Sequence, residues 1–143
     1  MRFKTLTSTV LLMIVLAFTA CSTATHSAQS GSKSPQASAQ GSSSPRTGTF
    51  EGLNDKHVWG TVKVAGGKVA LSDFSSDAGP DLHVYLTNGT NESAVNAGKQ
   101  LGNVAFDKPS QTFSIGGVDA SKYNTVVIHC DKAKAGFGAA ALS

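Results

Sequence analysis

Residues 123–130 read Tyr-Asn-Thr-Val-Val-Ile-His-Cys, and this segment is the clearest strand of the chain. Threonine, valine and isoleucine are branched at Cβ, which suits an extended, pleated backbone. Neighbouring side chains of a strand point to opposite faces of the sheet. The sequence therefore predicts Cys130 on the same face as Ile128 and Val126. It predicts His129 on the other face, so His129 and Cys130 should not bind one metal ion together unless a bulge intervenes.

The same alternation of apolar and polar residues recurs along the domain and is interrupted by clusters of Gly, Asn, Asp and Pro. It predicts further strands at Gly48–Glu51, His57–Val64, Lys68–Phe74, Leu82–Thr87, Leu101–Val104, Gln111–Ile115 and Phe137–Leu142. Residues 65–67, Ala-Gly-Gly, predict a tight hairpin turn, and the irregular residues 88–100 can hold a short helix. About eight short strands with regular turns predict an all-β fold, an antiparallel β-sandwich or a closed barrel, and we favour the sandwich.

The first 20 residues are interpreted as an export signal. Arg2 and Lys4 precede an apolar run, and residues 18–21 read Phe-Thr-Ala-Cys. The run is too short to cross a bilayer as a helix. Small residues before a cysteine resemble a bacterial lipobox, in which the cysteine sulfur is lipidated and the new amino terminus acylated. The resemblance implies an extracytoplasmic lipoprotein held by Cys21 to the cell membrane, or to an outer membrane. An ordinary secretory signal is the alternative.

A tether is predicted over residues 21–47. After Cys21 it consists almost entirely of Ser, Ala, Thr, Gln, Gly and Pro, with Lys33 and Arg46 as its charged residues. It offers no large apolar side chain whose burial could offset the entropy of ordering, so we expect a disordered linker. The folded domain is then residues 48–143.

The net charge of the chain limits the classes of partner that can be expected. Without Arg2 and Lys4 of the signal, ten basic residues remain against nine acidic ones. Such a nearly neutral surface gives no reason to expect nucleic acid as a partner. No serine–histidine–aspartate spacing, carboxylate pair or phosphate loop rises above chance, so a stand-alone enzyme is not indicated.

Several blocks of the domain resemble a known family. They are Phe50 with Gly52, residues 58–62 (Val-Trp-Gly-Thr-Val), 71–74 (Leu-Ser-Asp-Phe), 79–86 (Gly-Pro-Asp-Leu-His-Val-Tyr-Leu), 123–130, and Phe137-Gly138 with Ala141-Leu142. Their order resembles the DM-thirteen domain, which occurs alone in bacterial lipoproteins and beside DOMON domains in larger proteins. The resemblance implies a β-sandwich and electron transfer centred on Cys130, with a redox protein as partner. His129 stands where the family commonly has Trp.

Cys130 is the one thiol left to the domain once Cys21 is lipidated. Without a second thiol, a redox cycle would need a mixed disulfide, a sulfenic acid or a bound prosthetic group. Haem ligated by Cys130 and copper held by His57, His83 and Cys130 are both chemically reasonable. The chain has no Cys-x-x-Cys-His motif, however, and its two methionines lie in the signal, so no motif indicates either cofactor.

Two placements of Cys130 stay open. Among valine and isoleucine side chains the thiol would be an inert core residue, as in a non-catalytic envelope module that binds a protein or glycan. At the end of its strand, before Asp131, it could instead be partly exposed. There Lys132 and Lys134 would favour the reactive thiolate if they approach, as a redox role requires.

The remaining candidates receive structural interpretations. We interpret His57 and His83 as solvated surface residues, and Trp59 and Tyr85 as residues that pack on the sheet. Three aspartates, Asp73, Asp77 and Asp81, recur around a turn without the spacing of a calcium loop. Asp81 is expected to fix the turn at Gly79-Pro80. His26 falls in the tether and is expected to have no role.

Overall fold

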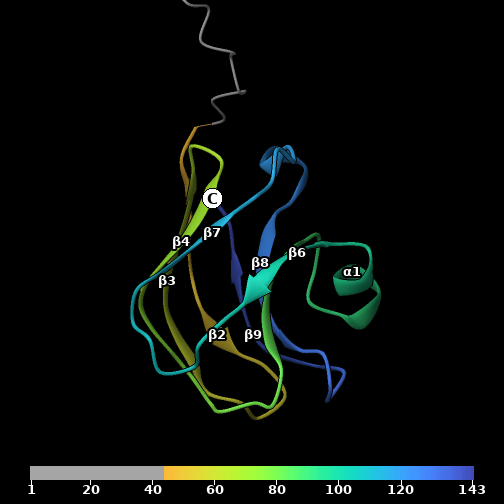
Figure 1. The fold of residues 1–143 in the computed structure, drawn as a ribbon. Helices are drawn as coiled ribbons and strands as arrows, with labels where there is room; N and C mark the ends of the chain where they lie inside the picture. The colour runs from red at the N-terminus through yellow and green to blue at the C-terminus, as the bar shows by residue number, and fades with distance from the viewer. Residues whose placement is uncertain (1–43) are drawn as a thin grey trace, which may run out of the picture. The chain divides into compact units, whose positions relative to one another are not determined.

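The alternating strands fold into two antiparallel sheets that pack face to face in the computed structural model, which describes residues 44–143 (Figure 1). One sheet has the order β1 (Arg46–Thr49), β3 (Val58–Ala65), β4 (Lys68–Ser76) and β7 (Gln111–Ser114). The other has the order β2 (Glu51–Gly52), β9 (Ala135–Ala141), β8 (Thr125–Cys130), β5 (Leu82–Thr87) and β6 (Lys99–Asn103). The predicted all-β antiparallel sandwich is confirmed.

The first predicted strand, Gly48–Glu51, is divided between the two sheets. β1 pairs with β3, whereas β2 pairs with β9 in the opposite sheet. Phe50 lies between them, and its buried ring packs edge-on against Phe74 in the core. The chain thus changes sheet at Phe50, where the aromatic side chain is buried.

The core consists of the residues that alternate inward from both sheets. β8 contributes Val126, Ile128 and Cys130, and their neighbours across the core include Val62 and Leu71 of the four-stranded sheet. The prediction that Cys130 shares a face with Ile128 and Val126 is confirmed, and this face is the inward one. The hairpin between β3 and β4 is also confirmed, since Gly66 and Gly67 both have positive φ, as a tight turn of this kind requires.

The outer face of the five-stranded sheet is covered as well, which is why all six residues of β8 are buried. A short helix, α1 (Glu92–Asn96), packs against β5 on this side (Figure 1). It buries Val95, and the side chain of Asn91 caps it by accepting a hydrogen bond from the amide of Ala94 at 2.8 Å. The helix that residues 88–100 were expected to hold is confirmed. A single turn of 3₁₀ helix, Ala120–Lys122, precedes β8.

The amino-terminal predictions fall mostly outside residues 44–143. The signal, Cys21, His26 and most of the tether belong to the part that the structure does not describe. At the predicted end of the tether, Arg46 already pairs with Val64 in β1, and its guanidinium donates hydrogen bonds to the carbonyls of Tyr123 and Ala120. Within residues 44–143, no helix has the length and apolar character needed to span a bilayer.

Candidate functional site

Of the two placements of Cys130 that the sequence left undecided, the structure shows the buried one. Its side chain is 0 % exposed and belongs to the core between the sheets, while Lys132 and Lys134 are exposed on the following turn. Cys130 does not line the hollows beside Gly66, Thr61 and Asn91 on the described domain. At rest the sulfur therefore behaves as a small apolar core group.

Cys130 is nevertheless at the rim of the sheet. It forms the last rung of three strands, paired with Leu82, the first residue of β5, and with Ala135, the first residue of β9. The four-residue turn 131–134 follows directly. Val126 is equally buried but is not a terminal residue of β8: it is the second residue of the strand, opposite Leu86 and Ala140.

The opposite face of the same strands carries a polar cluster, which we call the outer-face cluster. Its members are Asp81, His83, Tyr85, Glu92, Gln100, His129 and Asp131. The register of β5 with β8 places His83 directly opposite His129. The backbone amide of Asp131 donates to the carbonyl of Asp81 at 3.0 Å, so the two strand ends are tied together. Alternation along β5 and β8 therefore gathers these side chains on one surface.

His129 is held by two carboxylates. Its Nδ1 lies 2.8 Å from Asp131 Oδ1, and its Nε2 lies 2.8 Å from Glu92 Oε2 at the start of α1. The side chain is 3 % exposed, and its ring packs edge-on against Tyr85 at 5.8 Å between centroids. Both ring nitrogens of His129 therefore contact a carboxylate, one from the turn after β8 and one from α1.

Asp131 is the centre of the cluster. Its carboxylate also accepts hydrogen bonds from the hydroxyl of Tyr85, at 2.9 Å to Oδ2, and from Gln100 Nε2 at 3.1 Å. Burial raises the pKa of Asp131, but the hydrogen bonds from His129 and Tyr85 and the nearby His83 outweigh it, so the pKa lies below its usual value. Asp131 is therefore an ionised acceptor at neutral pH.

Tyr85 keeps its proton over a wide pH range. Burial, the hydrogen bond to Asp131 and the negative charges of Asp131, Glu92 and Asp81 raise the pKa of Tyr85 to about 12. The predicted packing of Tyr85 on the sheet is confirmed by its contacts with His83 and His129. The sequence did not indicate that the hydroxyl of Tyr85 donates a hydrogen bond to Asp131.

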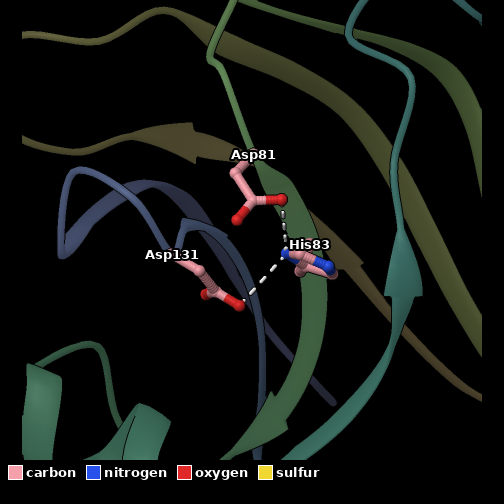
Figure 2. A group of neighbouring side chains, drawn as sticks. All are labelled: Asp81, His83 and Asp131. Carbon is pink, nitrogen blue, oxygen red and sulfur yellow. Dashed lines mark ion pairs between the residues drawn. The ribbon is translucent and has the colours of Figure 1, made fainter.

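His83 is not the solvated surface residue that the sequence suggested. Its side chain is only 12 % exposed, because β5 is an interior strand flanked by β8 and β6. Its Nδ1 lies 3.2 Å from Asp131 Oδ2 and 3.9 Å from Asp81 Oδ1. Figure 2 shows the two carboxylates converging on this nitrogen, Asp81 from just before β5 and Asp131 from just after β8. The nitrogen is closed to solvent and makes no hydrogen bond within residues 44–143.

Several other sequence predictions can now be assigned. His57 is exposed, as expected, and its Nδ1 lies 3.5 Å from Asp77. It therefore lies away from the core residue Cys130, and the copper set of His57, His83 and Cys130 is not assembled. The prediction that Trp59 packs on the sheet is wrong, because the side chain is exposed beside an irregularity of β3 at Gly60.

Of the three aspartates around the predicted turn, Asp81 alone joins a group of metal-ligating side chains in the described domain. Asp73 lies in a strained conformation with positive φ, and Asp77 accepts a hydrogen bond from the amide of His57 at 3.0 Å. Asp131 and Glu92 were missed as site residues. The sequence feature that could have indicated this site is the presence of two histidines, His83 and His129, at outward positions of two strands that are otherwise rich in apolar residues.

The chain was compared with models of protein families. The model of a family described as Electron transfer DM13 matches residues 49–142. No curated protein and no solved structure matches the chain.

Proposed function

Because the chain belongs to the electron-transfer DM13 family, we propose that it transfers electrons at the cell envelope while tethered to a membrane. The observation that carries this proposal is the extent of the match, which runs over residues 49–142 and so includes every strand from β2 to β9. The assignment therefore rests on the whole sandwich rather than on one motif.

The anchor in this proposal is the lipidated Cys21. It is supported by the sequence Phe-Thr-Ala-Cys at residues 18–21 and by the polar composition of residues 22–45, which precede β1. Each buried methylene of an acyl chain contributes about 0.8 kcal/mol to membrane binding, so several chains hold a protein firmly. A tether of this composition lets the domain reach a partner away from the lipid headgroups.

The redox group in this proposal is Cys130, which becomes reactive when the last rung of the sheet opens. A lone thiol can transfer electrons by thiol–disulfide exchange. The thiolate attacks a disulfide of a partner protein, a mixed disulfide forms, and the partner's other sulfur leaves as a thiolate. The place of Cys130 at the last residue pair of β8 supports this route, since local opening there would free the sulfur without melting the two sheets. Such opening must also break the contacts of the neighbouring Asp131.

A second candidate function is a binding module of the envelope in which Cys130 only packs. The observation that favours it is the complete burial of the side chain, at 0 % exposure. Under this candidate the sulfur becomes accessible only when the whole domain unfolds.

Thiol labelling of the native protein separates the two. The mature chain with Cys21→Ser carries Cys130 as its single thiol. Its matched control is the same chain with Cys130→Ala and Val126→Cys, which moves the thiol to an equally buried position inside β8. The redox route predicts that Cys130 is labelled at least tenfold faster than the control thiol, with a rate insensitive to low denaturant. Equal rates that both rise with denaturant would contradict this route and support the binding module.

A further inference from the structure

Three ligand atoms of the outer-face cluster converge on one point beside β5. Asp81 Oδ1, His83 Nδ1 and Asp131 Oδ2 all lie within 4.8 Å of one another. Zinc binds nitrogen and carboxylate oxygen at about 2.0–2.2 Å, which places two ligands of a tetrahedral ion about 3.4 Å apart. The 3.2 Å between His83 and Asp131 is close to this spacing. The distance from His83 Nδ1 to Asp81 Oδ1, 3.9 Å, is longer than this spacing, so the Asp81 carboxylate, which is 30 % exposed, must move slightly to bind the ion.

His83 presents an unsatisfied atom at this point. Its Nδ1 is sealed from solvent and makes no hydrogen bond to another described residue, although two carboxylates lie beside it. Buried polar atoms are nearly always hydrogen-bonded, and an exception calls for an explanation such as an ion. A cation between the three ligands would use the nitrogen lone pair and neutralise the two carboxylates.

The ligand carboxylate of Asp131 is already fixed by its surroundings. Tyr85 and His129 donate hydrogen bonds to it, and Gln100 donates to the oxygen that faces His83. His129 is in turn held by Glu92. Metal sites in proteins use such outer-shell partners to orient the ligands. Asp131 therefore needs little further ordering to bind an ion.

The chemistry of the three ligands selects the kind of ion. One imidazole and two carboxylates suit a divalent ion that accepts both nitrogen and oxygen ligands. Calcium and magnesium prefer oxygen ligands throughout, and copper(I) prefers sulfur. Asp81 and Asp131 are 30 % and 26 % exposed, so solvent reaches the two carboxylates, whereas His83 Nδ1 is closed to it. Three protein ligands leave a fourth position for water.

We propose that Asp81, His83 and Asp131 bind one divalent first-row transition-metal ion, with zinc(II) as the ion that fits best. The site is on the opposite side of the five-stranded sheet from Cys130, and its occupation does not depend on the electron-transfer role proposed for the sulfur.

Calorimetric titration with zinc(II) tests this proposal. The protein is the mature chain with Cys21→Ser, without a histidine tag, after treatment with a chelator. The expected result is saturable binding of one ion per chain. His83→Ala and Asp131→Asn should each weaken it at least tenfold, whereas Cys130→Ala should leave it unchanged. Cobalt(II) should give the visible absorption of a low-symmetry site in the parent chain and lose it in the same two variants.

His57→Ala is the matched control, because His57 is an exposed histidine beside an aspartate, with Nδ1 3.5 Å from Asp77. It should bind zinc(II) as the parent does. Asp81→Asn, at the most exposed ligand, provides a third variant if His83→Ala does not fold. Absence of saturable binding to the folded parent would overturn the proposal, since His83 would then be a histidine paired with two aspartates. An equal loss of affinity in His57→Ala would overturn it as well.

Discussion

Replacing His129 with alanine is expected to destabilise the domain by about 2–4 kcal/mol. The ring makes one hydrogen bond with Asp131 and one with Glu92, each at 2.8 Å. Hydrogen bonds to charged groups contribute about 1.5–3 kcal/mol each. The bond to Glu92 must be discounted because that side chain is 43 % exposed and screened by water. For a domain of this size the loss corresponds to a fall in Tm of roughly 10–25 °C.

The assay is urea unfolding of the parent and the variant, followed by circular dichroism, in buffer containing a chelator so that metal binding does not contribute. His57→Ala is the matched control, since this histidine is exposed and its pairing with Asp77 should contribute less than about 1 kcal/mol. Glu92→Gln separates the two bonds and should cost under about 1 kcal/mol. A loss for His129→Ala no larger than that for His57→Ala would refute the view that the cluster stabilises the outer face of the sheet.

Three further predictions follow from the geometry. The pKa of Asp131 is lowered in the folded state, so its ionised carboxylate stabilises the fold above the pKa of the unfolded state, and this stability is lost as pH falls through the folded-state pKa. Asp131→Asn should therefore reduce the loss of unfolding free energy at acid pH, as measured by urea unfolding at a series of pH values. The pKa of Tyr85 is raised from 10.0 to about 12, so its contribution is present below pH 10 and is lost as pH rises toward 12. Tyr85→Phe should remove the late phenolate absorbance. Cys130→Ser should cost about 1–3 kcal/mol in urea unfolding, because its hydroxyl enters an apolar core.

The period-two pattern was sufficient to predict the sheets and the two faces of β8. Alternation is a property of every extended backbone, so the opposite faces of Cys130 and His129 followed from their positions in the segment alone. The pattern could not reveal that the outward face is covered. That depends on α1 and on the flanking strands, which bury Thr125, Val127 and His129 together.

The outer-face cluster could not be predicted from the sequence for a related reason. Asp81 and Asp131 are far apart in the chain, and they meet because β5 and β8 pair antiparallel with His83 opposite His129. Alternation assigns each residue to a face, but β5 and β8 are not joined by a hairpin turn that would reveal which residues stand opposite one another. The division of the first predicted strand at Phe50 was missed as well, because it depends on which sheet each half pairs with.

The most direct test of the proposed electron transfer is the reaction of the native, mature chain with Cys21→Ser, in which Cys130 is the single thiol, with oxidised glutathione, followed by intact mass. We predict a mixed disulfide at Cys130 that forms faster than global unfolding allows and is absent in Cys130→Ala. A chain that stays unmodified until denaturant unfolds it would contradict Cys130 as the redox group.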